Sequence, residues 1–192
     1  SEKGLESLIM RHMTGTDGLA VVPDRVAERP PPYGGTGYTA GSPQDYDRAH
    51  ALDVSQLFAF LRATQPEAFK KLAMVDAHDA KDINRLKFLG RLSAEIGKRG
   101  AIDVLRKGIE HHPAGHFDLF YGTPSEGNAK AAALHAQNRF SITRQLAYSV
   151  DETRRALDLG LFINGLPIAT FELKNSLTKQ TVEDAVEQYR RD

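Results

Sequence analysis

Residues 156–175 read Ala156-Leu-Asp-Leu-Gly-Leu-Phe-Ile-Asn-Gly-Leu-Pro-Ile-Ala-Thr-Phe-Glu-Leu-Lys-Asn175, and this stretch predicts a β-hairpin. Two apolar, β-rich runs flank Asn164-Gly165, a dipeptide that accepts the positive φ angles of a tight turn. Strand alternation puts Glu172 and Lys174 on one face of the second strand, two residues apart. The hairpin therefore presents a carboxylate and an ammonium group side by side.

A third charged residue, Asp158, joins this face only if the hairpin departs from the simplest register. A strict two-residue loop pairs Ile163 with Leu166 and Asp158 with Phe171, which turns Asp158 away from Glu172. A longer loop, or one bulge in either strand, shifts the register by one residue and brings the two carboxylates to the same face. We predict such a bulge or longer loop, and an ideal two-residue hairpin would exclude a shared site.

Two carboxylates on one face suit a hard divalent cation such as Mg²⁺, with Mn²⁺ as a substitute. The backbone carbonyl of Leu173 is a candidate further ligand. A metal at Asp158 and Glu172 would activate water for phosphodiester hydrolysis, and Lys174 would orient that water or stabilise developing charge. The alternative from these residues alone is an exposed cross-strand ion pair with no catalytic role.

Five fragments of the chain carry a resemblance to a known family: Leu57–Pro66, Arg99–Gly108, Asn138–Tyr148, Asp158–Asn175 and Glu183–Arg190. Through them the chain resembles the N-terminal endonuclease domain of the restriction (R) subunit of type I restriction-modification enzymes. The resemblance implies the PD-(D/E)XK nuclease fold. The expected class is therefore α/β, a restriction-endonuclease-like mixed sheet flanked by helices, with a helical insertion.

The resemblance also implies that Asp158, Glu172 and Lys174 are the catalytic motif residues. Leu157 stands where the family motif has proline, a looseness that this superfamily tolerates. The family also has a Gln-x-x-x-Tyr element on the helix after the strand that carries the lysine. Gln188 is the candidate for its glutamine, which would hold substrate or site geometry. This element has tyrosine four residues after the glutamine, whereas Asp192 stands at that position here, so the role of Gln188 carries over only in part.

An acidic residue on the first helix commonly assists this type of site, and Glu6 is the best match. Leu5, Leu8 and Ile9, with His12 or Met13, predict a helical apolar stripe, so Glu6 is expected beside the buried face. Glu6 is a secondary candidate, with a solvated helix flank as the alternative.

We expect one endonuclease domain over residues 1–192. Its core is predicted at about 1–22 and 113–192, separated by a Pro/Gly-rich loop over 23–44 and a helical insertion over about 45–112. The resemblance implies that the helicase-like motor of the subunit lies downstream and is absent from this chain.

Within the core, the pattern predicts a short strand at 18–22, strands at 117–121 and 140–148, a helix at 128–137 and a closing helix from about residue 180. The cluster Asp76, His78, Asp79 and Asp82 resembles a capped helix start rather than a catalytic group.

Composition limits the classes of protein. The chain has no cysteine, which excludes disulfides and thiolate chemistry, and we expect a cytoplasmic location. No apolar run approaches the roughly 20 residues of a transmembrane helix, and the first residues show no signal-peptide pattern, so no membrane partner is expected. The net charge is zero, which predicts weak, salt-sensitive DNA binding by the isolated chain.

The function that follows is metal-dependent hydrolysis of double-stranded DNA without sequence specificity of its own. The resemblance implies methyltransferase and specificity subunits as partners, together with the helicase-like domains of the same subunit. ATP is expected only for the full-length subunit, since no phosphate-binding loop motif occurs here. Two alternatives remain: a stand-alone PD-(D/E)XK nuclease or resolvase, and a non-catalytic docking module of a DNA-processing complex.

Overall fold

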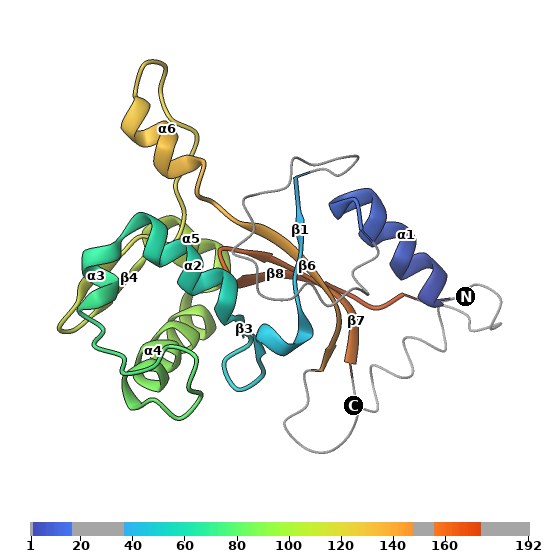
Figure 1. Ribbon diagram of the computed structural model, residues 1–192, viewed down its shortest axis with the longest axis horizontal. Coiled ribbons are helices and arrows are strands. Elements are labelled where there is room, and N and C mark those ends of the chain that lie inside the picture. Colours follow the sequence, from blue (N-terminus) through green and yellow to red (C-terminus); the bar gives the residue numbers. More distant parts are fainter. Residues whose placement is uncertain (1, 17–36, 148–155, 174–192) are drawn as a thin grey trace.

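The computed structural model describes residues 2–16, 37–147 and 156–173, which form a mixed α/β fold (Figure 1). Its helices are α1 (Glu2–Thr14), α2 (Val54–Thr64), α3 (Pro66–Lys70), α4 (Ile83–Arg99), α5 (Ala101–Lys107) and α6 (Ala129–His135), with a 3₁₀ turn at Pro43–Asp45. Its strands are β1 (Thr39–Ala40), β2 (Tyr46–Asp47), β3 (Leu52–Asp53), β4 (Ile109–His111), β5 (Gly115–Phe117), β6 (Phe140–Ala147), β7 (Ala156–Ile163) and β8 (Leu166–Phe171).

Four strands form the main sheet in the order β1-β6-β7-β8. β1 runs parallel to β6, whereas β6, β7 and β8 are mutually antiparallel, so the predicted mixed sheet is confirmed. In Figure 1 the helix α1 lies at one end of this sheet and α2 to α5 gather at the other. Two further strand pairs, β2-β3 and β4-β5, stand outside the main sheet.

The side chains of the larger core cluster come from the helical region and from the turn end of the β7–β8 hairpin. Its fully buried members include Leu52, Leu57, Phe60, Leu61, Phe88, Leu89, Leu92, Val104, Phe117 and Leu166. A smaller cluster of Met10, Ile142 and Leu159 joins α1 to β6 and β7. The helical region therefore packs on the sheet at the hairpin turn, whereas α1 packs on it through the smaller cluster.

The hairpin turn itself is a two-residue turn at Asn164 and Gly165, with φ angles of 50° and 81°. Both positive values belong to the turn type that Asn-Gly favours. Asn164 is fully buried: its Oδ1 accepts from the Arg139 N–H at 2.6 Å, and its Nδ2 donates to the carbonyl of Leu119 at 2.8 Å. The Asn164 side chain thus ties the turn to the residue that precedes strand β6 and to the segment that follows β5.

The start of helix α2 packs directly on this turn. The Asp53 N–H donates to the Gly165 carbonyl at 2.9 Å. A Cβ atom at position 165 would overlap the Asp53 carbonyl oxygen and would lie 2.7 Å from the Leu57 backbone nitrogen. Glycine is favoured at residue 165 for two reasons, since the backbone angle disfavours a side chain and the neighbouring helix leaves no room for one.

Several sequence-based expectations are confirmed in the described residues. The hairpin, the strand at β6 and the helix at α6 lie where the sequence predicts them. The apolar residues of α2 are buried, and a new helix begins at Pro66. Asp82 is the N-cap of α4, because its Oδ1 accepts from the Arg85 N–H at 2.8 Å. None of the helices that the structure describes is long and apolar enough to cross a membrane.

Three expectations are wrong. The predicted buried stripe of α1 fails, since Leu5 and Leu8 are 42% and 65% exposed, whereas Glu6 is buried. The strand expected at 117–121 ends at Phe117, because β5 pairs only with the three residues of β4. The Pro/Gly-rich stretch includes strand β1 in its described part, where it pairs with β6. The expected strand at 18–22 and the closing helix lie outside the described residues, and the limits of an insertion stay a prediction.

Asp53 is a buried carboxyl group at the N-cap of α2, where it accepts from the Gln56 N–H at 3.1 Å. Burial raises its pKa from an ordinary value near 3.8 to about 7, against the lowering effect of that hydrogen bond. The folded state therefore favours the protonated form, and the stability present at low pH is lost as the pH rises through about 7.

We expect Asp53→Asn to remove this loss, because asparagine keeps the cap and carries no charge. At pH 8 the variant should be more stable than the wild type by about 2–4 kcal/mol, and near pH 4 the two should agree. Urea unfolding at several pH values measures this difference. Asp82→Asn is the matched control, since the pKa of that cap is lowered by its hydrogen bonds and the variant should lose stability at neutral pH. Equal pH slopes for wild type and Asp53→Asn would contradict the prediction.

Candidate active site

A β-bulge in β8 decides which residues of the hairpin share a face. From the turn, Ile163 pairs with Leu166 and Phe162 with Pro167, but the next pair is Leu161 with Ala169. Ile168 is therefore the extra residue of β8 in the described ladder. The hairpin combines a two-residue turn with a bulge, so the predicted shift of one residue is confirmed.

The bulge brings Asp158 to the strand position of Glu172. Leu159 pairs with Phe171, and continuing this register by one residue sets Asp158 opposite Glu172 on the same face of the sheet. The Oδ2 atom of Asp158 accepts a hydrogen bond from the Leu173 N–H at 2.5 Å. Asp158 is half-buried and Glu172 is exposed, so the carboxylate pair lies at the accessible end of the hairpin. Lys174 and Gln188 lie outside the described residues.

Glu6 is held in a buried ion pair. Its Oε2 lies 2.8 Å from Nη2 of Arg144, and its Oε1 accepts from Nε2 of Gln145 at 2.9 Å. Glu6 is 1% exposed and Arg144 is 6% exposed, so the alternative of a solvated helix flank is wrong. A carboxylate inside a helix face is tolerated here because a guanidinium group from β6 neutralises it.

Glu6 contacts the part of β6 that lies beside Asp158 of β7. Arg144 pairs with Leu159 and Leu146 with Leu157, so Gln145 occupies the strand position opposite Asp158. Gln145 has a φ of 55°, an unusual value for a residue with a side chain, and its amide turns to Glu6. Glu6 thus contacts the segment of β6 that lies beside Asp158.

We expect Glu6→Gln to destabilise the protein by about 3 kcal/mol, because it removes the carboxylate that faces the buried Arg144 guanidinium. Chemical denaturation measures the loss, and the exposed substitution Glu126→Gln controls for a general loss of negative charge. The double variant Glu6→Gln/Arg144→Gln should be more stable than the sum of the two single effects predicts. Strict additivity would show that the two charges do not interact.

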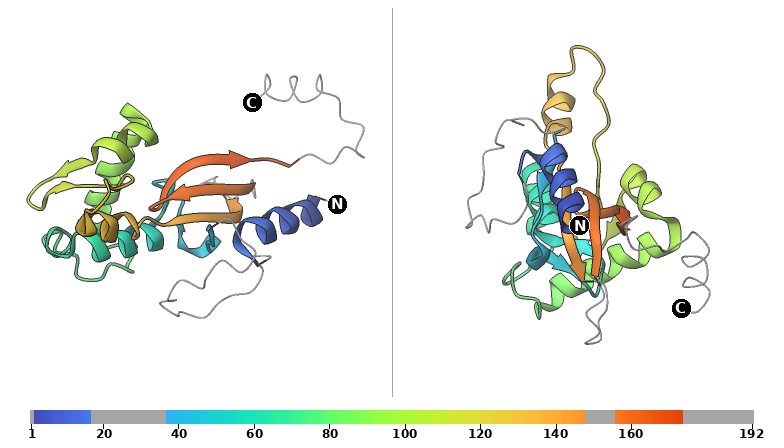
Figure 2. Two further views of the ribbon diagram at one scale, coloured as in Figure 1. Left: turned by 90° about the horizontal axis from the view of Figure 1, so that it is seen from above. Right: turned by 90° about the vertical axis from the view of Figure 1, so that its right-hand side faces the viewer.

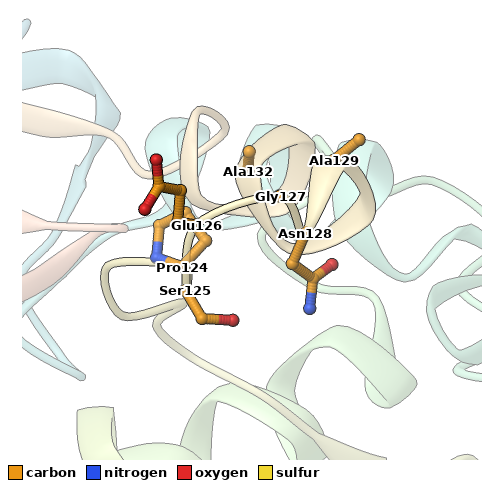
Figure 3. Close-up of a pocket in the computed structure, with 7 residues that line it drawn as sticks. All are labelled: Pro124, Ser125, Glu126, Gly127, Asn128, Ala129 and Ala132. Carbon is orange, nitrogen blue, oxygen red and sulfur yellow. The ribbon is translucent and has the colours of Figure 1, made fainter.

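Two hollows on the described surface do not contain these residues. One, of about 340 Å³, is lined by a loop and the first turn of α6: Pro124, Ser125, Glu126, Gly127, Asn128, Ala129 and Ala132 (Figure 3). In Figure 3 the side chains of Glu126 and Asn128 point away from one another. With one carboxylate and no converging donors, this hollow offers no metal site.

The other hollow, of about 430 Å³, lies between β2 and the start of α4. Asp47 accepts there from Arg85 Nη2 at 3.3 Å, and its other oxygen lies 3.0 Å from Nδ1 of His50. The sequence gives no signal for this group, since Arg85 lies among other charged residues of a helix. The contact between Asp47 and His50 is local, because the two residues are three apart in one turn. The contact between Asp47 and Arg85 holds β2 to α4, so these side chains have a structural explanation.

A metal site has to be judged from the number and kind of its ligands. Among residues 2–16, 37–147 and 156–173, no three His, Asp or Glu side chains gather in a group that could bind a metal. The candidate set at the end of the hairpin is smaller, with two carboxylates and the backbone carbonyl of Leu173. Such a set fits a cation that keeps several of its waters, as Mg²⁺ does.

The region that includes the hairpin is similar to a known protein family. Residues 117–192 match the family model described as Type I restriction enzyme R protein N terminus (HSDR_N). No curated protein and no solved structure matches the chain. The matched region includes Asp158, Glu172 and the sequence positions of Lys174 and Gln188. Over residues 117–192, the chain is therefore similar to the family of type I restriction enzyme R protein N termini.

Proposed function

We propose that the chain is the metal-dependent endonuclease domain of a type I restriction enzyme R subunit. It hydrolyses phosphodiester bonds of double-stranded DNA and does not read the sequence itself. The observation that carries the proposal is the bulge at Ile168, which sets Asp158 opposite Glu172. A hairpin without this bulge would separate the two carboxylates by the thickness of the sheet.

The residues at the end of the hairpin fit Mg²⁺, with Mn²⁺ as a substitute. Asp158 and Glu172 would bind it through carboxylate oxygens and Leu173 through its carbonyl, all of them hard ligands. The hydrogen bond from the Leu173 N–H to Asp158 supports this set, because it joins one carboxylate to the peptide segment that carries the other two ligands. When bound, the cation supplies Lewis acidity that makes water nucleophilic near neutral pH.

The side chains around the carboxylates have separate tasks. Lys174 orients the attacking water and stabilises the negative charge that develops on the phosphate. Gln188 holds the substrate or the geometry of the site. Glu6 acts through Gln145, which it keeps in position opposite Asp158.

Other parts of the restriction complex carry out sequence recognition, methylation and DNA translocation. Sequence recognition belongs to a specificity subunit and methylation to a methyltransferase subunit, within a cytoplasmic complex. ATP is used only by the helicase-like domains of the full-length subunit, which translocate DNA. The domain described here then cuts wherever DNA is presented to it.

Nicking of supercoiled plasmid at low salt tests the proposal. We expect the wild-type chain to cleave in Mg²⁺ or Mn²⁺ and to stop when EDTA is added, and we expect Lys174→Ala to reduce cleavage strongly. Cleavage that survives in EDTA would contradict the metal requirement. Preferential cutting of branched DNA would instead support a stand-alone nuclease or resolvase.

If the isolated chain does not cleave, the same variants are tested in the full-length subunit assembled with its partners. Loss of cleavage with intact translocation would support the proposed site. Unchanged cleavage in that complex would favour the third possibility, a docking module without catalytic function.

A further inference from the structure

Helices α4 and α5 carry a large share of the positive charge of a neutral chain. Residues 81–107, which begin two residues before α4 and end with α5, contain eight of the 25 Lys and Arg residues but three of the 25 Asp and Glu residues, an excess of five positive charges. The remainder of the chain has 17 basic and 22 acidic residues, an excess of five negative charges. The net charge of zero thus hides a separation of charge along the molecule.

Three of these cations form a line on the exposed side of α4. Lys87, Arg91 and Lys98 are separated by four and seven residues, which sets them within about 40° of one another around the helix and spreads them over about 16 Å of its axis. Lys87 and Lys98 are exposed, and the Arg91 side chain is 49% exposed. We call these three residues the basic stripe.

Acidic residues nearby neutralise the basic stripe only in part. Glu95 lies 3.2 Å from Arg91 but also 2.7 Å from Arg99, and Asp103 lies between Arg99 and Lys107. Two carboxylates are therefore shared among three cations. No salt bridge to Lys87 or Lys98 occurs within the described ranges, so both ammonium groups face solvent.

We propose that the basic stripe on α4 binds the phosphate backbone of duplex DNA, as a contact surface separate from the hairpin. About 16 Å of duplex carries roughly ten negative charges, so three aligned cations meet a dense row of phosphates. The stripe contains no aromatic residue or amide side chain, so it binds without reading bases.

This surface lies at the end of the molecule that is remote from the carboxylate pair. In Figures 1 and 2 the helices α4 and α5 lie beyond the turn end of the hairpin, whereas α1 lies towards its open end. Asp158 is six residues from the turn, about 20 Å along β7. A duplex that touches both regions spans at least about six base pairs, so the stripe anchors DNA away from the place of cleavage.

The test is fluorescence anisotropy of a labelled 30-base-pair duplex in EDTA at several salt concentrations. The variant is Lys87→Gln/Arg91→Gln/Lys98→Gln, and the matched control is Lys70→Gln/Lys71→Gln/Lys130→Gln, which removes the same charge from exposed residues at the C-terminal end of α3 and in α6. We expect the stripe variant to raise Kd about tenfold or more at 50 mM salt and to reduce the salt slope by about 2–3. The control should change Kd less than about twofold.

Three results would overturn the proposal. Equal weakening by both triple variants would show that net charge alone matters, and an unchanged Kd in the stripe variant would show that DNA binds elsewhere. A polyaspartate peptide is a third arm, and binding as tight as that of DNA would assign the surface to acidic proteins. Because EDTA abolishes metal-dependent cleavage, this measurement is independent of the proposed nuclease activity and can succeed where that activity fails.

Discussion

Asp158→Asn is expected to lower the rate of DNA cleavage by at least about a hundredfold and to leave the fold intact. Asparagine keeps an oxygen that accepts from the Leu173 N–H, so the contact across the hairpin ends is preserved. What it removes is the negative charge that a divalent cation requires. The measurement is the single-turnover rate of plasmid nicking at saturating Mn²⁺, in whichever form of the protein cleaves.

Two comparisons separate this effect from loss of structure. Glu126→Gln removes an exposed carboxylate far along the chain from the hairpin and should cleave at the wild-type rate. The free energy of unfolding of Asp158→Asn should stay within about 1 kcal/mol of the wild type, as expected for a half-buried residue that keeps its hydrogen bond. Full activity in a folded Asp158→Asn protein would remove Asp158 from the site.

Gly165→Ala is expected to destabilise the protein by about 4 kcal/mol, which is among the largest effects of a single methyl group. Part of the loss is backbone strain, because residue 165 has a φ of 81°. The larger part is overlap with the first turn of α2, where a Cβ atom would meet Asp53 and Leu57. Thermal or urea unfolding measures the combined loss.

The chain offers a matched control for this substitution at Gly127. Gly127 has the same φ of 81°, but no atom beyond its two chain neighbours lies within 4 Å of the place where its Cβ would be. Gly127→Ala should therefore show backbone strain alone, about 1–2 kcal/mol. The difference between the two variants gives the cost of the overlap between the added methyl group and α2, and equal losses would show that this overlap costs nothing.

The hairpin could be predicted from sequence because its signals are local. Asn164-Gly165 between two β-rich runs indicates a turn and two strands without knowledge of the rest of the chain. The bulge could be predicted only by adding the requirement that Asp158 and Glu172 share a face. Its position at Ile168 could not, since nothing in the order of apolar residues on β8 marks one of them as extra.

The face of α1 was predicted wrongly for a physical reason. Periodicity assigns apolar residues to the interior, which favours Leu5 and Leu8 over Glu6. The burial of Glu6 depends on Arg144, which lies 138 residues further along the chain. A pattern within one helix holds no information about such a partner. The same limit applies to the short strand β1, whose existence depends on pairing with β6.

The bulge at Ile168 also makes the candidate site sensitive to chain length. Ile168 is half-buried and is the odd residue of its strand, so many other side chains could replace it at modest cost. Its deletion would instead remove the bulge and shift the residues of β8 after it by one position relative to β7. Glu172 would then lie on the opposite face of the sheet from Asp158. Position 168 is thus a spacer, and the number of residues in β8, more than the identity of this one, is what keeps the two carboxylates together.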